Sequence, residues 1–166
     1  ANEVTVHGKQ DYNMGFWDKL LSNEVLISAI VGWTVAQILK TLIDFGLNKS
    51  FTPERLVGSG GMPSSHSATV CGLTTASALC YGVESFQFAI SFVLAAVVMY
   101  DAIGVRQETG KQAKLLNLIM EQDWFNLNNQ EIQKRLKEFV GHTPLQVAAG
   151  AALGIILAFV VHQSYL

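Results

Sequence analysis

The fold of this chain is decided around the stretch GGMPSSHSA at residues 60–68, where a glycine-rich loop meets a helix. Glycines let the backbone approach a ligand closely, and Pro63 suits a first helical turn, so we expect the helix to begin around Pro63. The N–H groups and dipole of a helix N-terminus favour an anion. His66 would lie beside that anion as a proton donor. The stretch predicts a phosphate site whose cradle is formed by Gly61, Ser64 and Ser65.

The composition indicates an integral membrane protein. Half of the 166 residues are hydrophobic and only 14% are charged, which is too apolar for an ordinary soluble domain of this size. Stretches close to the roughly 20 apolar residues that span a bilayer are Val25–Phe45, Phe86–Gly104 and Leu145–Val161, with Ser64–Val83 as a weaker fourth. We therefore predict an all-α polytopic membrane bundle of about four transmembrane helices.

The chain is expected to form a single membrane domain over residues 1–166. Residues 1–23 would be a polar and interfacial segment without a cleavable signal peptide, and residues 24–166 the helical bundle. Hydrophobic periodicity between residues 107 and 140 predicts two short amphipathic helices in the long polar loop, lying over the mouth of the bundle. The last helix is expected to have Thr143 as its N-cap and Pro144 as its first residue.

The distribution of charge predicts the orientation. The net charge of −2 excludes a broadly basic nucleic-acid binder. With four crossings, the loops at residues 46–63 and 105–143 share one face. That face, with the adjoining helix end, holds nine of the eleven cations: Lys40, Lys49, Arg55, Arg106, Lys111, Lys114, Lys134, Arg135 and Lys137. The positive-inside rule makes this face cytoplasmic, with both termini outside, in the cytoplasmic (plasma) membrane.

Two histidines, each close to a predicted helix start, are expected on that face. A single histidine there has a plain explanation, as a backbone cap or an interfacial side chain. His66 and His142 together, backed by cations, favour a catalytic pair. Asp101, near the end of an apolar helix, is either a functional carboxylate or the partner of Arg106 or Lys40 in a structural ion pair, and the sequence leaves both open.

The remaining polar candidates have structural explanations as well. Lys40 would either bind phosphate or extend from the helix end to the surface. Arg55, Arg106 and Lys111 are candidate phosphate ligands or ordinary positive-inside residues. Cys71 and Cys80 would stand about 13 Å apart on one helix, which excludes a disulfide between them. Incidental positions are expected for His7 and His162.

Three segments resemble the divergent branch of the type 2 phosphatidic acid phosphatase and vanadium haloperoxidase superfamily. They are residues 60–68, residues 100–106 with 110–113, and residues 141–145. In the resemblance, Pro63-Ser64-Ser65-His66 matches a motif whose histidine acts as the acid, and His142 takes the place of the nucleophile. Lys40 and Arg55 are candidates for the phosphate-holding motif. The resemblance implies a phosphatase-like bundle over residues 24–166 and no cofactor or metal.

The chain departs from that pattern near His142. Gln146 stands where the family has an aspartate that orients the imidazole, and no arginine precedes His142 at the usual offset. Arg106 would supply the missing cation and Asp101 the missing carboxylate. About four crossings, where the membrane phosphatases usually have six, point to a homodimer or to a reduced function.

The sequence supports three hypotheses. The first is a membrane phosphatase that hydrolyses a lipid phosphate or pyrophosphate, with His142 as nucleophile and His66 as acid. The second is a non-catalytic phospholipid- or anion-binding or transport protein that retains the phosphate pocket. The third is a small scaffold whose polar motifs only pack helices.

Overall fold

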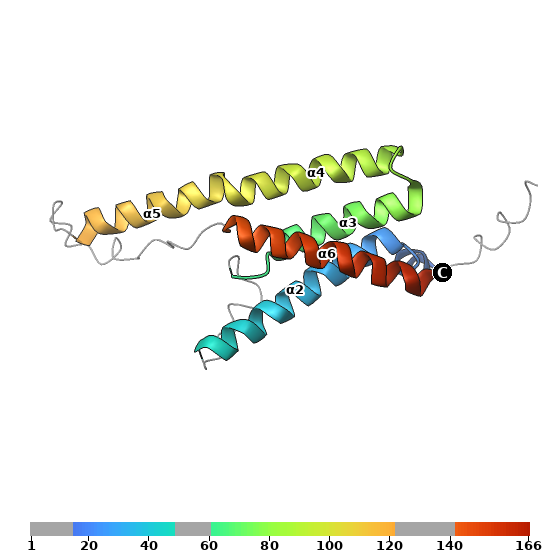
Figure 1. The fold of residues 1–166 in the computed structure, drawn as a ribbon, viewed down its shortest axis with the longest axis horizontal. Helices are drawn as coiled ribbons and strands as arrows, with labels where there is room; N and C mark the ends of the chain where they lie inside the picture. The colour runs from blue at the N-terminus through green and yellow to red at the C-terminus, as the bar shows by residue number, and fades with distance from the viewer. Residues whose placement is uncertain (1–14, 49–60, 122–141) are drawn as a thin grey trace, which may run out of the picture.

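The computed structural model of the chain describes residues 15–48, 61–121 and 142–166, and every regular element in these ranges is an α-helix (Figure 1). The predicted all-α class is therefore confirmed. In chain order the helices are α1 (Phe16–Leu21), α2 (Glu24–Asn48), α3 (Ser65–Tyr81), α4 (Phe86–Ile103), α5 (Val105–Glu121) and α6 (Pro144–Tyr165).

Three helical stretches in the described ranges are long and apolar enough to cross a membrane. They are Glu24–Gly46, Phe86–Ile119 and Pro144–Tyr165. The predicted fourth crossing, α3, is not among them, because it is shorter and richer in small and hydroxylated residues. It packs against α2, α4 and α6, and it is the least apolar of these four helices, so a comparatively polar helix lies at the centre of the bundle (Figure 1).

Three hydroxyl groups of α3 donate to carbonyl oxygens. Thr69 donates to Ser65 O at 2.7 Å, and Ser77 donates to Leu73 O at 2.8 Å. Thr74 donates both to a carbonyl of its own helix and, at 3.0 Å, to Ser91 O of α4. Because a buried hydroxyl without a partner is destabilising, these bonds allow a polar central helix.

Glycines set how closely α6 approaches α3. A Cβ on Gly150 or Gly154 would lie nearer than 3.0 Å to the carbonyl oxygen of Ser64 or Ala68, respectively. Two glycines four residues apart form the small-residue surface that lets membrane helices touch at their backbones. The pairings Ser64–Gly150 and Ala68–Gly154 also show that α3 and α6 run parallel, so both helices begin at the same end of the bundle.

Helix α2 runs antiparallel to α3. A Cβ on Gly32 would be 2.8 Å from Ala68 O, and one on Gly72 would be 3.1 Å from Ser28 O. The short turn between α3 and α4 reverses the chain again. The C-terminal ends of α2 and α4 therefore meet the N-terminal ends of α3 and α6. We call this the histidine end, defined by His66 and His142.

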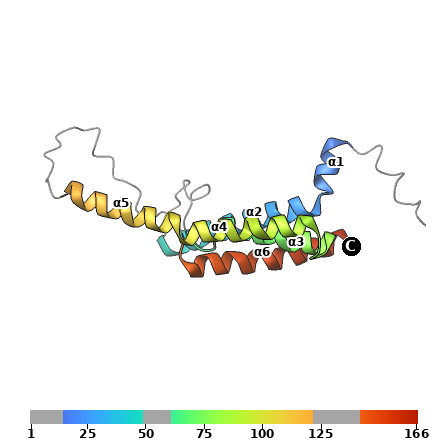
Figure 2. The ribbon, with the colours of Figure 1, turned by 90° about the horizontal axis from the view of Figure 1, so that it is seen from above.

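Several predicted boundaries agree with the structure, and two features differ. Thr143 is the N-cap of α6 and Pro144 its first residue, as predicted. Helix α3 begins at Ser65 rather than at Pro63, because the Ser64 hydroxyl accepts from Ser67 N and forms the cap. The first predicted amphipathic helix is α5, but it continues roughly along α4 and projects past the bundle instead of covering its mouth (Figures 1 and 2). The second predicted helix lies outside the described residues.

Candidate functional site

The two histidines predicted to act together lie together. His66 is in the first turn of α3 and exposed, whereas His142 directly precedes the cap of α6 and is 4% exposed. Their ring centroids are 6.3 Å apart, and the ring planes are inclined by 57°. This separation is short enough for both rings to contact one small group bound between them.

Gln146 holds the His142 ring through the cap of α6. Thr143 and Gln146 form a reciprocal capping box: Gln146 N donates to Thr143 Oγ1 at 3.3 Å, and Thr143 N donates to Gln146 Oε1 at 3.0 Å. The same Oε1 lies 3.2 Å from His142 Nδ1.

This geometry assigns the protons on the His142 ring. Because Oε1 accepts from the backbone N–H of Thr143, the amide oxygen, not its NH₂, faces His142. His142 Nδ1 is therefore the donor in the hydrogen bond to Gln146 Oε1. In the neutral ring the lone pair then lies on Nε2. Gln146 thus orients the imidazole as the family's aspartate would, but without its negative charge.

The start of α3 is tied to α6 by hydrogen bonds. Ser64 N donates to Gln146 O at 3.0 Å, and Ser67 Oγ donates to Ser64 Oγ at 3.0 Å. Ser64 and Ser65 are both buried. Gly61, two residues before Pro63, has a φ of 86°, in the left-handed region that glycine adopts without steric cost. Within the predicted cradle, the Ser64 hydroxyl and amide therefore fix the helix start next to His66.

Asp101 is brought to the histidine end through its neighbour. His142 N donates to Ala102 O at 3.1 Å, which links the segment before α6 to the last turn of α4. Asp101 precedes Ala102 and is partly buried. The turn that carries the Asp101 carboxylate is therefore in backbone contact with His142.

Lys40 is a buried cation on the face of α2 that packs on the bundle. It is 2% exposed, so its ammonium group does not extend to the surface as one interpretation required. The buried positions Gly32, Ala36 and Lys40 recur every four residues and lie on one helix face. Gly32 of α2 lies level with Ala68 of α3. Lys40 lies about two helical turns further along α2, toward the histidine end, and so lies beyond the level of Ser64.

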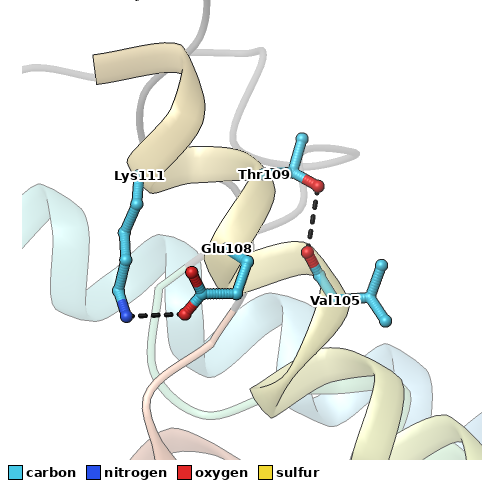
Figure 3. Close-up of polar contacts among 4 residues, drawn as sticks. All are labelled: Val105, Glu108, Thr109 and Lys111. Atoms are coloured by element: carbon cyan, nitrogen blue, oxygen red, sulfur yellow. Dashed lines mark hydrogen bonds and ion pairs between the residues drawn. The ribbon is translucent and has the colours of Figure 1, made fainter. Parts of the chain in front are cut away.

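The other predicted cations are distributed differently. Lys111 lies on the exposed side of α5 and forms an ion pair with Glu108 at 2.6 Å, next to the Thr109–Val105 hydrogen bond (Figure 3). Arg106 belongs to the first turn of α5, directly after α4, and its side chain is not described. Arg55 lies outside the described residues.

Two features of the described residues were missed from the sequence. The sequence pattern marks Gln146 only as a departure from the family, although its position four residues after His142 is the signal for their contact. His162, expected to be incidental, lies 2.7 Å from Glu24 Oε1. That contact joins α6 to α2, and no pattern in the sequence around either residue predicts it.

The fold and the site define a helical membrane protein with a histidine pair at two adjoining helix starts. The family model described as the Divergent PAP2 family matches residues 21–157, and the chain belongs to that family. It is also 37% identical over 152 residues to the "Uncharacterized membrane protein YuiD" of Bacillus subtilis (strain 168), covering 86% of this chain and 96% of the relative. No solved structure matches the chain.

Proposed function

We propose that the protein is a membrane phosphatase that hydrolyses a lipid phosphate or pyrophosphate at the cytoplasmic leaflet. The observation that carries the proposal is the His66–His142 pair, 6.3 Å apart between ring centroids, with His142 Nδ1 held by Gln146. Membership of a family related to phosphatidic acid phosphatases supports the phosphatase class.

In the proposed reaction the two histidines have complementary tasks. His142 Nε2 attacks phosphorus and forms a phosphohistidine, while the bond from phosphorus to the leaving oxygen breaks. Protonated His66 gives its proton to that oxygen. Neutral His66 then takes a proton from water, which attacks the phosphohistidine, releases phosphate and restores both rings.

The charge on the phosphoryl oxygens requires compensation in the transition state. The N-terminal ends of α3 and α6 contribute the positive ends of two helix dipoles. Lys40 is a buried cation on α2 toward the histidine end, and we assign it the main electrostatic role. Arg55 and Arg106 are further proposed ligands, with Asp101 supporting the histidines. Lys111, paired with Glu108, is the weakest member of the set.

Phosphoenzyme trapping tests the proposal. The full chain in detergent is mixed with labelled lipid monophosphates and pyrophosphates, quenched under conditions that preserve phosphohistidine, and mapped by peptide. We expect label on His142, none in His142→Ala, and accumulated label in His66→Ala if the second step slows more than the first. Gln87→Ala changes an exposed polar side chain on α4 at the opposite end and is the control. Absence of both label and phosphate release in the folded parent would overturn the proposal.

One observation favours a second candidate, a phosphate-binding or transport protein without turnover. Gln146 is neutral, so it does not stabilise a positively charged His142 ring as an aspartate does. A binder would hold vanadate or inorganic phosphate with an affinity that depends on Lys40, yet would release no phosphate from any lipid. The same trapping experiment, combined with vanadate binding, separates the two candidates.

A further inference from the structure

A second polar cluster lies at the end of the bundle opposite the histidine end. Glu24 is in the first turn of α2, Cys80 in the last turn of α3 and His162 in the last turn of α6. One carboxylate oxygen, the thiol sulfur and one imidazole nitrogen all lie within 4.8 Å of one another. Three side chains from three helices therefore converge on one point.

An ion pair alone accounts for only part of this arrangement. His162 Nδ1 lies 2.7 Å from Glu24 Oε1, and their side chains are 23% and 13% exposed, respectively. A structural His–Glu contact needs no third member, but the Cys80 sulfur is close to both. Cys71, the other cysteine, lies 3.8 Å from Met99 Sδ and behaves as an ordinary core side chain. The two thiols of α3 thus have different surroundings.

The donor set has the chemistry of a transition-metal site. Cysteine sulfur, imidazole nitrogen and carboxylate oxygen are the three side-chain ligands that Zn²⁺ takes in proteins, at about 2.0–2.3 Å. A tetrahedral ion with such bonds spaces its donors by about 3.3–3.8 Å. Donor atoms as far apart as 4.8 Å would need to approach one another by about 1.0–1.5 Å, which rotation of the side chains can supply. The 2.7 Å contact between His162 Nδ1 and Glu24 Oε1 would open to admit the ion.

We propose that Glu24, Cys80 and His162 bind one Zn²⁺-like divalent transition metal, with the fourth position open to water or another ligand. The thiol loses its proton on binding, and the neutral imidazole supplies a nitrogen lone pair. Cys80 is exposed, so an ion can enter without disrupting the helices. The bound metal would join the ends of α2, α3 and α6, away from the residues proposed to handle phosphate.

Cobalt substitution tests the site directly. The full chain is purified in detergent, stripped with a chelator and titrated with Co²⁺, which gives a thiolate-to-cobalt charge-transfer band only when a cysteine is a ligand. We expect one equivalent of Co²⁺ with this band, displacement by Zn²⁺, and no displacement by Mg²⁺. Metal analysis after dialysis should find one zinc per chain.

Variants separate the proposed site from adventitious binding. Cys80→Ser should abolish the charge-transfer band, and His162→Gln should weaken cobalt binding at least tenfold, whereas Cys71→Ala should retain the parent's band and affinity. Zinc should raise the melting temperature of the parent and of Cys71→Ala but not of Cys80→Ser. Melting without metal shows whether each variant folds. A parent without the band, or a folded Cys80→Ser that binds as tightly as the parent, would overturn the proposal.

Discussion

Replacing Gly154 by alanine tests the close contact between α3 and α6. The added Cβ would meet Ala68 O, C and Cα, all at 2.9 Å or less. These are backbone atoms of a helix, so no flexible side chain can move aside, and α6 must shift away from α3. The same shift would also separate the starts of the two helices, where the histidine pair lies.

The magnitude follows from two opposing terms. Overpacking a close contact destabilises by about 1–3 kcal/mol, while alanine in a helix is favoured over glycine by about 0.5–1 kcal/mol. Gly46 provides the matched control, because a Cβ there meets nothing within 4 Å. Gly46→Ala therefore gains the helix preference of alanine without the cost of overpacking. The difference in unfolding free energy between the two variants therefore isolates overpacking, at about 1–3 kcal/mol.

The assay is denaturant unfolding in mixed micelles, followed by circular dichroism and tryptophan fluorescence. We expect the Gly154→Ala midpoint to fall below that of the parent and the Gly46→Ala midpoint to stay level or rise. Equal midpoints for the two variants would refute the reasoning, because they would mean that α6 does not approach α3 as closely as described.

Three further predictions concern the histidine end. Ser64→Ala removes the cap of α3 and an acceptor of the buried Ser67 hydroxyl, so chemical unfolding should show a loss of about 0.5–2 kcal/mol. Lys40→Met replaces the buried ammonium group with an uncharged side chain of similar shape. Vanadate affinity, measured by calorimetry, should fall tenfold or more, since a bond to a charged group contributes about 1.5–3 kcal/mol. Lys114→Met on the exposed side of α5 is the control and should bind vanadate as the parent does. Gln146→Glu keeps the capping box and places a carboxylate at a helix N-terminus, so the melting temperature should stay level or rise, while the pH profile of His142 phosphorylation should move to higher pH; an unmoved profile would contradict the assigned contact.

The helices were predictable because each carries a local signal. Apolar runs of bilayer length define α2, α4 and α6, and Thr143 before Pro144 specifies the start of α6. The predicted start of α3, at Pro63, lies two residues before the observed start. The Ser64 hydroxyl accepts from the backbone N–H of Ser67 and closes the first turn. The capping serine was the stronger signal.

Contacts between distant segments were predictable only in part. The topology brought His66 and His142 to one end, and the structure confirms that the rings are close. The predicted topology did not place Glu24 against His162, because that contact depends on the register of α2 against α6. Helix register is set here by glycine contacts that a hydropathy pattern does not resolve. The helix starts and the residues beside them could therefore be predicted from the sequence, whereas the meeting of Glu24, Cys80 and His162 from three helices could not.

The presence of glutamine at position 146 is not explained by helix capping. Glutamate would fill the same capping position equally well, and a carboxylate near a helix N-terminus is favoured by the dipole. Glutamine gives up that stabilisation while keeping the same bonds to Thr143 and His142. The feature that distinguishes the two side chains is the charge next to the imidazole. A neutral partner leaves the His142 ring easier to deprotonate than a carboxylate would, so a nucleophilic Nε2 would be available at lower pH. If the protein turns over substrate, glutamine therefore shifts the working pH; if it only binds phosphate, the missing charge removes repulsion between the site and its anion.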